Sequence, residues 1–62
     1  MNINNIDFIN NEIRVNGMYA GYYKKLENGF FKTFFDTFHC LLKNVSSDTL
    51  NGLKTAIFNQ IN

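Results

Sequence analysis

The dipeptide Asn16-Gly17 constrains the fold of this chain more than any other feature of its sequence. An Asn-Gly pair between alternating apolar residues is a strong signal for a two-residue type I′ hairpin turn, because both turn positions need a positive φ. A turn here sets Ile13 opposite Ala20 on the two flanking segments. The sequence therefore predicts an antiparallel hairpin centred on residues 16 and 17.

A second turn of the same length, at Asn10-Asn11, adds a further strand before this hairpin. It sets Phe8 opposite Ile13, so that both turns bring apolar side chains to one face of the same sheet. The predicted strands cover residues 5–9, 12–16 and 18–25. Their shared apolar face comprises Ile6, Phe8, Ile13, Val15, Met18, Ala20 and Tyr22.

The opposite face of this predicted sheet carries polar and aromatic side chains. The same registers place Asp7 opposite Arg14, as a cross-strand pair of opposite charge. Tyr19 lies beside Arg14, and Tyr23 projects from the same face on the other side of Gly21. We therefore expect an amphipathic sheet with two tyrosines on its outer side.

After Leu26 the apolar residues recur at steps of three and four. This spacing predicts a helix with an apolar arc of about 140° and with Asn28 as its N-cap. Its apolar residues are Phe30, Phe31, Phe34, Phe35, Phe38, Leu41, Leu42 and Val45. One alternative stays open: Asn28-Gly29 is also a hairpin signal and Phe and Thr favour strands, so residues 30–36 could form a further strand.

A second helix is predicted to begin near Ser46. With Ser46 as N-cap, Val45 and Leu50 have the spacing of a hydrophobic staple. Gly52 lies off the apolar stripe and marks either a close contact or a tolerated defect. The short connection between the two helices predicts an αα-hairpin. The apolar stripe of this second helix comprises Leu50, Leu53, Ile57, Phe58 and Ile61.

The predicted fold is therefore one compact α+β domain over residues 1–62. A three-stranded antiparallel β-meander is followed by two α-helices (βββαα), which pack on one sheet face. Cys40 is the only cysteine, so no disulfide can form within the chain. The sequence begins with no signal-peptide pattern and has no apolar run of the roughly 20 residues that a membrane span needs. We expect a cytoplasmic protein, in the host cell if a phage encodes it.

Residues that could carry chemistry are few. His39-Cys40 is the only pair with catalytic or metal-binding residue types, and adjacent helix positions point about 100° apart. A zinc site needs three or four ligands, so we expect no metal. Cys40 lies in the polar arc of the predicted helix, so we expect it to be an exposed thiol. The carboxylates form no acid–base pair and the glycines form no phosphate-binding loop. The sequence predicts neither an enzyme nor a cofactor.

The outer sheet face is the candidate binding surface. We expect Arg14, Tyr19, Tyr23 and Lys25 to contact a partner there. Tyrosine and arginine are enriched in protein hot spots, and aromatic and basic side chains on an open sheet can also stack single-stranded bases. A solvated face without function is the remaining interpretation. The net charge of +1 favours neither nucleic acid nor membrane.

Small size and the absence of motifs indicate a non-enzymatic binding protein, an inhibitor or adaptor that occupies a surface of a larger protein or nucleoprotein machine. Phage proteins such as anti-CRISPR proteins are of this kind. The alternatives are a small nucleic-acid-binding regulator that uses the tyrosine face, and a structural subunit. The wide apolar arc of the first predicted helix also indicates a homodimer. The expected dimer interface consists of Phe30, Phe35, Leu41 and Leu42.

Overall fold

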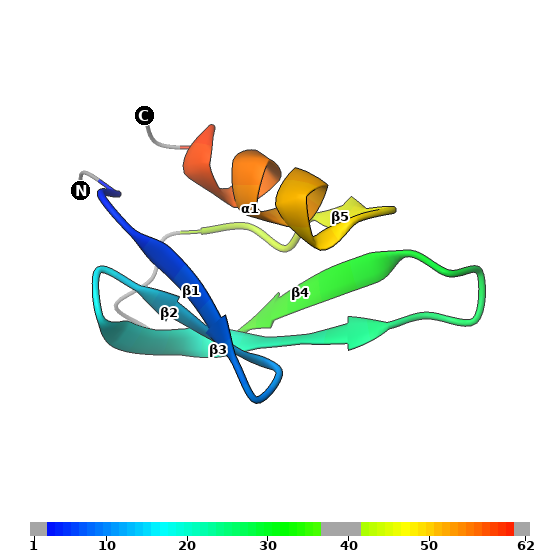
Figure 1. Cartoon of the computed structure of the whole chain (residues 1–62), viewed down its shortest axis with the longest axis horizontal. Helices are drawn as coiled ribbons and strands as arrows, with labels where there is room; N and C mark the ends of the chain where they lie inside the picture. The colour runs from blue at the N-terminus through cyan, green and yellow to red at the C-terminus, as the bar shows by residue number, and fades with distance from the viewer. Residues whose placement is uncertain (1–2, 37–41, 61–62) are drawn as a thin grey trace.

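The computed structural model describes residues 3–36 and 42–60, and Figure 1 shows their arrangement. Within these residues, one antiparallel sheet has five strands in the order β1-β2-β3-β4-β5, so that each strand pairs with its neighbour in the sequence. One helix follows the last strand. The elements are β1 (Ile6–Ile9), β2 (Glu12–Val15), β3 (Met18–Lys25), β4 (Phe31–Phe35), β5 (Ser46–Ser47) and α1 (Leu50–Phe58).

Both predicted N-terminal turns are confirmed. Asn10 and Asn11 have φ values of 52° and 67°, and Asn16 and Gly17 have φ values of 53° and 82°. These are the positive values that a two-residue type I′ turn requires. The predicted register of β1 and β2 is also confirmed, with Phe8 opposite Ile13 and with Asp7 opposite Arg14.

The pairing of β2 with β3 differs from the prediction by one residue. Arg14 pairs with Tyr19 as expected, but Ile13 pairs with Gly21, so the prediction that Ile13 faces Ala20 is wrong. Ala20 is the extra residue of a β-bulge in β3. Because side chains alternate between faces along a strand, one inserted residue moves every later side chain to the opposite face.

The bulge exchanges the positions of two tyrosines. The Tyr23 ring packs at 5.1 Å from the Phe8 ring and 6.0 Å from the Phe31 ring, on the side of the core. Tyr22, predicted on the apolar face, stacks on Phe34 on the outer side instead. Met18 is a further correction, because its side chain is 64% exposed rather than buried.

The first predicted helix is wrong over residues 31–35, which form β4 and pair with β3. The alternative of a further strand is confirmed. A three-residue loop at 27–29 makes this hairpin: Gly29 has a φ of 89°, and the Leu26 N–H donates to the Phe30 carbonyl at 2.7 Å. Once a partner strand is present, strand-favouring Phe and Thr pair with it in spite of their helical spacing.

The second predicted helix begins later than expected. Thr49, rather than Ser46, is the N-cap of α1, and its hydroxyl accepts a hydrogen bond from the Gly52 N–H at 2.9 Å. Ser46 belongs to β5 and pairs with Lys32 of β4. The predicted βββαα order with an αα-hairpin is therefore wrong: the described residues form a five-stranded sheet with a single helix near the C-terminus. Close packing of Gly52 against Ser47 explains the glycine.

The core lies between the sheet and α1, which sits on one side of the strands in Figure 1. Leu53 and Ile57 of the predicted apolar stripe are buried under α1, whereas Leu50 and Phe58 of the same stripe are exposed. Thr33 of β4 is fully buried, and its hydroxyl accepts from the Val45 N–H at 2.8 Å and donates to the Val45 carbonyl at 3.3 Å. The buried apolar residues are Ile3, Ile6, Ile13, Val15, Ala20, Leu42, Leu53 and Ile57.

A candidate binding face on the outer side of the sheet

The side of the sheet that faces away from α1 carries a mixed aromatic and charged surface, which we call the outer face. It draws side chains from the three central strands and from the residue after β4. No element of residues 3–36 and 42–60 packs over it in Figure 1. The outer face comprises Glu12, Arg14, Tyr19, Tyr22, Lys24, Lys32, Phe34 and Asp36.

An aromatic pair lies at the centre of the outer face. Tyr22 of β3 and Phe34 of β4 are direct cross-strand partners, with ring centroids 5.3 Å apart and ring planes inclined by 16°. Both side chains are half-buried. Stacked pairs of this kind contribute about 0.5–1.5 kcal/mol beyond the area they bury. The pair therefore gives the outer face a rigid apolar centre.

Two lysines lie directly beside this aromatic pair. Lys24 and Lys32 are cross-strand partners, two residues along each strand from Tyr22 and Phe34. The Lys24 ammonium lies 5.8 Å from the centroid of the Tyr22 ring, and the Lys32 ammonium lies 5.6 Å from that of Phe34. Within the described part of the chain, neither amine has a carboxylate within 4 Å.

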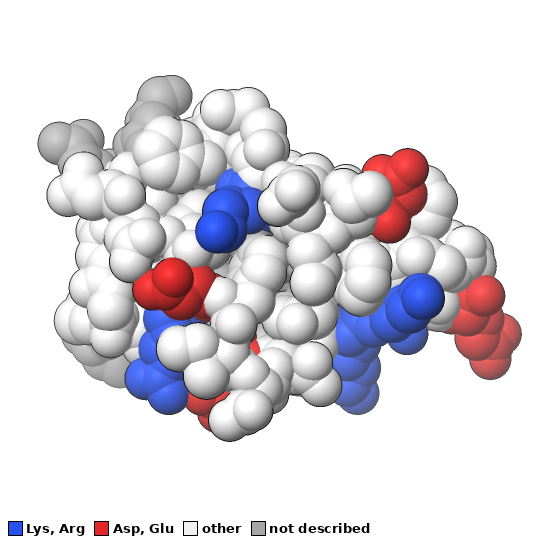
Figure 2. Space-filling view, in the orientation of Figure 1, with Lys and Arg blue, Asp and Glu red and all other residues white. Residues whose placement is uncertain are grey.

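This lysine pair is electrostatically unfavourable in the isolated protein. Like charges directly opposite each other destabilise an antiparallel pair, and a favourable cross-strand pair would stabilise it by about 0.2–1 kcal/mol. Cation–π contacts at exposed sites recover about 0.5–1 kcal/mol each. Figure 2 shows basic side chains gathered over the β3–β4 hairpin. The outer face thus has a cationic end.

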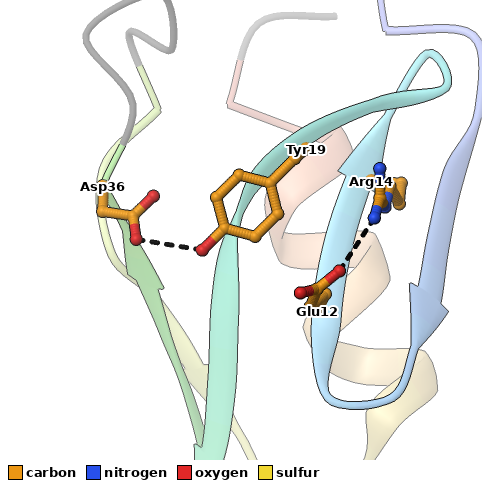
Figure 3. A network of polar contacts seen from close by, with 4 residues as sticks. All are labelled: Glu12, Arg14, Tyr19 and Asp36. Atoms are coloured by element: carbon orange, nitrogen blue, oxygen red, sulfur yellow. Dashed lines mark hydrogen bonds and ion pairs between the residues drawn. The ribbon is translucent and has the colours of Figure 1, made fainter.

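The other end of the outer face is balanced in charge, and Figure 3 shows its polar contacts. Arg14 forms an ion pair with Glu12, with 2.8 Å between Nη2 and Oε1, and its guanidinium carbon lies 5.9 Å from the centroid of the Tyr19 ring. The Tyr19 hydroxyl donates to an Asp36 carboxylate oxygen at 3.0 Å. This hydrogen bond is the main reason that the pKa of Tyr19 is raised above its ordinary value, and slight desolvation of the exposed side chain adds to the effect. Glu12, rather than the predicted Asp7, is therefore the ion-pair partner of Arg14.

The structure places only two of the four predicted partner-binding residues on the outer face, namely Arg14 and Tyr19. Tyr23 packs against the core, and Lys25 lies over the Phe31 ring, which also packs against the core. The residues that sequence reasoning missed are Tyr22, Lys24, Lys32 and Phe34. The Asn28-Gly29 signal could have found the last two, because a hairpin there brings β4 beside β3.

The predicted dimer interface loses the helix that motivated it. Phe35 packs against the core and Leu42 is buried. Phe30 is 42% exposed beside the 27–29 loop. Leu41, together with His39 and Cys40, lies outside the described residues. The homodimer stays a prediction, and the expected exposure of Cys40 is likewise untested.

Residues 3–36 and 42–60 contain no group of three or more His, Cys, Asp or Glu side chains that could hold a metal ion. In the same residues, no helix has the length and apolar character to cross a membrane.

The outer face presents aromatic rings, hydroxyl groups and ammonium groups. It can stack on flat groups, donate hydrogen bonds and attract anions. Comparison of the chain with protein families, curated proteins and solved structures gave no match.

Proposed function

We propose that the protein is a non-enzymatic binding protein, an inhibitor or adaptor that occupies a surface of a larger protein or nucleoprotein assembly through its outer face. The observation that carries this proposal is the Tyr22–Phe34 pair, with a lysine over each ring, on the side of the sheet away from the core. The cytoplasmic location expected from the sequence is part of the same proposal.

Two physical arguments support this function. The core lies on the other side of the sheet, so the large outer rings are not needed to fill it. Aromatic side chains are also well suited to binding, because they supply much contact area and lose little conformational entropy when they are immobilised. The β3–β4 pairing already holds Tyr22 against Phe34, which lowers the ordering cost of association further.

Affinity capture from cells of the source organism tests the proposal. The bait is the wild-type protein or the double variant Tyr22→Ser/Phe34→Ser, and Phe58→Ser is the matched control because Phe58 is an exposed aromatic on α1. We expect wild type and control to recover the same partners. The double variant should recover at least tenfold less of these partners, since truncation of a hot-spot residue costs about 2 kcal/mol or more of binding free energy.

Circular dichroism first establishes that each variant is folded. A folded double variant that recovers the same partners in the same amounts as wild type would contradict the proposal. A double variant that does not fold is replaced by Tyr22→Leu/Phe34→Leu, which keeps apolar bulk at both positions and removes only the aromatic rings.

A further inference from the structure

We infer that the ligand of the outer face is single-stranded nucleic acid, with a phosphate held between Lys24 and Lys32 and a base stacked against the Tyr22–Phe34 pair. This inference rests on the proposed function, because it names the partner class of the same face. It concerns only the cationic end of that face, where the two lysines and the two rings meet.

The lysine pair points to an anion. Direct cross-strand partners have Cβ atoms about 4.5–5.5 Å apart, and each ammonium sits on a flexible four-carbon stem. Lys24 and Lys32 can therefore both reach one phosphate placed between them. Such an anion converts the repulsion between two like charges into two favourable contacts, and no described carboxylate takes this role.

The aromatic pair points to a flat ligand next to that anion. Tyr22 and Phe34 lie two residues from the lysines on the same face, which is about 7 Å along each strand. A nucleotide has its base at a similar reach from its phosphate. In the free protein the lysine ammonium groups lie over the rings. When they move to a phosphate, they uncover ring surface on which a base can stack, as single-strand-binding proteins do.

Charge limits the length of the site. Glu12 and Asp36 lie at the other end of the outer face, beside Arg14 and Tyr19, and their carboxylates repel phosphates. The site therefore takes about two nucleotides, and its two lysines contact one phosphate. An acidic protein segment would satisfy the lysines but would offer no base to the rings, which is why nucleic acid is favoured.

Fluorescence anisotropy with a short labelled oligothymidine tests this inference on the full chain. The comparison ligands are an abasic oligonucleotide of equal length, which keeps the phosphates and lacks the bases, and an oligoglutamate peptide of equal charge. The variants are Lys24→Gln/Lys32→Gln and Tyr22→Leu/Phe34→Leu. Lys54→Gln is the matched control, because Lys54 is an exposed lysine of α1 that lies over the Phe8 ring on the core side.

We expect oligothymidine to bind with a slope of log K against log salt of about −0.7, since each phosphate that is neutralised on a single strand contributes about −0.7. Lys24→Gln/Lys32→Gln should bring this slope close to zero. Removing the bases, or introducing Tyr22→Leu/Phe34→Leu, should weaken binding at least about fivefold, as loss of one base–ring stack does. Lys54→Gln should bind as wild type.

Equal binding of the abasic strand, or equal competition by oligoglutamate, would overturn the inference. So would the absence of oligothymidine binding at low salt. If Tyr22→Ser/Phe34→Ser nevertheless loses its cellular partners in the capture experiment, the binding function stands and the ligand is a protein. If neither experiment shows an effect of the two rings, the proposed function fails as well.

Discussion

Replacing Gly21 with alanine should destabilise the protein severely, because β4 leaves no room for a side chain there. A Cβ atom built on Gly21 would touch the Phe34 carbonyl oxygen and lie only 2.7 Å from the Phe35 Cα atom and 3.0 Å from the Phe34 carbonyl carbon. Real Cβ atoms essentially never come within 3.0 Å of a heavy atom outside their own residue and its two chain neighbours. All three neighbours are backbone atoms of the paired strand, so they cannot rotate away.

The loss of folding stability in Gly21→Ala is the difference between two opposing effects. Overpacking costs about 1–3 kcal/mol, and sites whose neighbours cannot move lie at the upper end. Gly→Ala also gains about 0.4–1 kcal/mol, because alanine restricts the unfolded chain. The net loss is therefore about 2–2.6 kcal/mol. A domain of this size has a total stability of only about 3–5 kcal/mol from its core, so most of the stability is lost.

Urea denaturation followed by circular dichroism measures this loss. The dependence of the unfolding free energy on urea is about 1 kcal/mol per molar for so small a protein. The urea midpoint of Gly21→Ala should therefore fall by about 2 M or more. Gly29→Asn is the control, because Gly29 has open space around it, so that backbone strain at its φ of 89° is the only cost, and asparagine accepts a positive φ better than other residues with a side chain. The control should lose less than about 1 kcal/mol. A Gly21→Ala midpoint equal to that of wild type would refute the bulged pairing of β3 with its neighbours.

Three further predictions test the core and the polar network. Tyr23→Ala should destabilise by up to about 3 kcal/mol, since a half-buried aromatic that packs against the core is lost. Chemical denaturation that shows no change would indicate that this tyrosine lies on the outer face instead. Thr33→Val should cost about 1–3 kcal/mol, because it leaves the part-buried Val45 N–H without its acceptor, while the Val45 carbonyl keeps the hydrogen bond from the Thr33 backbone N–H. Hydrogen exchange should show faster exchange of the Val45 amide, and unchanged protection would contradict the role of the hydroxyl. Asp36→Asn should lower the pKa of Tyr19 towards its ordinary value of 10.0, measured by ultraviolet difference absorbance. Because the folded-state pKa of Tyr19 is raised, the stability contributed by its hydrogen bond to Asp36 is complete below pH 10.0 and is lost as the pH rises through the folded-state pKa. Wild type and Asp36→Asn should therefore differ in stability at neutral pH and converge in strong alkali.

Sequence reasoning succeeded wherever the decisive interaction is local. The positive φ values of Asn10, Asn11 and Asn16 are set by residue type and by the two-residue turns. These turns in turn set the register of β1 and β2, as well as the placement of Arg14 and Tyr19 on the outer face. The buried positions Leu53 and Ile57 of α1 were also predictable from their helical spacing, although Leu50 and Phe58 of the predicted stripe are exposed.

Sequence reasoning failed where the decisive interaction joins distant residues. The segment around Phe34 has helical spacing, yet it pairs with β3, and its strand state depends on that partner. Predicting a helix removed Phe34 and Lys32 from the candidate site. It also produced a dimer interface that included Phe35, which packs against the core.

The bulge at Ala20 shows most clearly the difference between what local sequence determines and what contacts between distant residues determine. The chain by itself determined where its first two turns lie and which side chains are large and apolar, because backbone preference and side-chain chemistry belong to single residues. Only the tertiary structure decided that Ala20 of β3 has no partner in β2, because this depends on how β3 fits β2 and β4 simultaneously. On the β4 side, the Ala20 carbonyl accepts a hydrogen bond from the Asp36 N–H at 3.2 Å. That one residue moved Tyr23 into contact with the core and Tyr22 onto the outer face, because alternation along a strand reverses with every inserted residue.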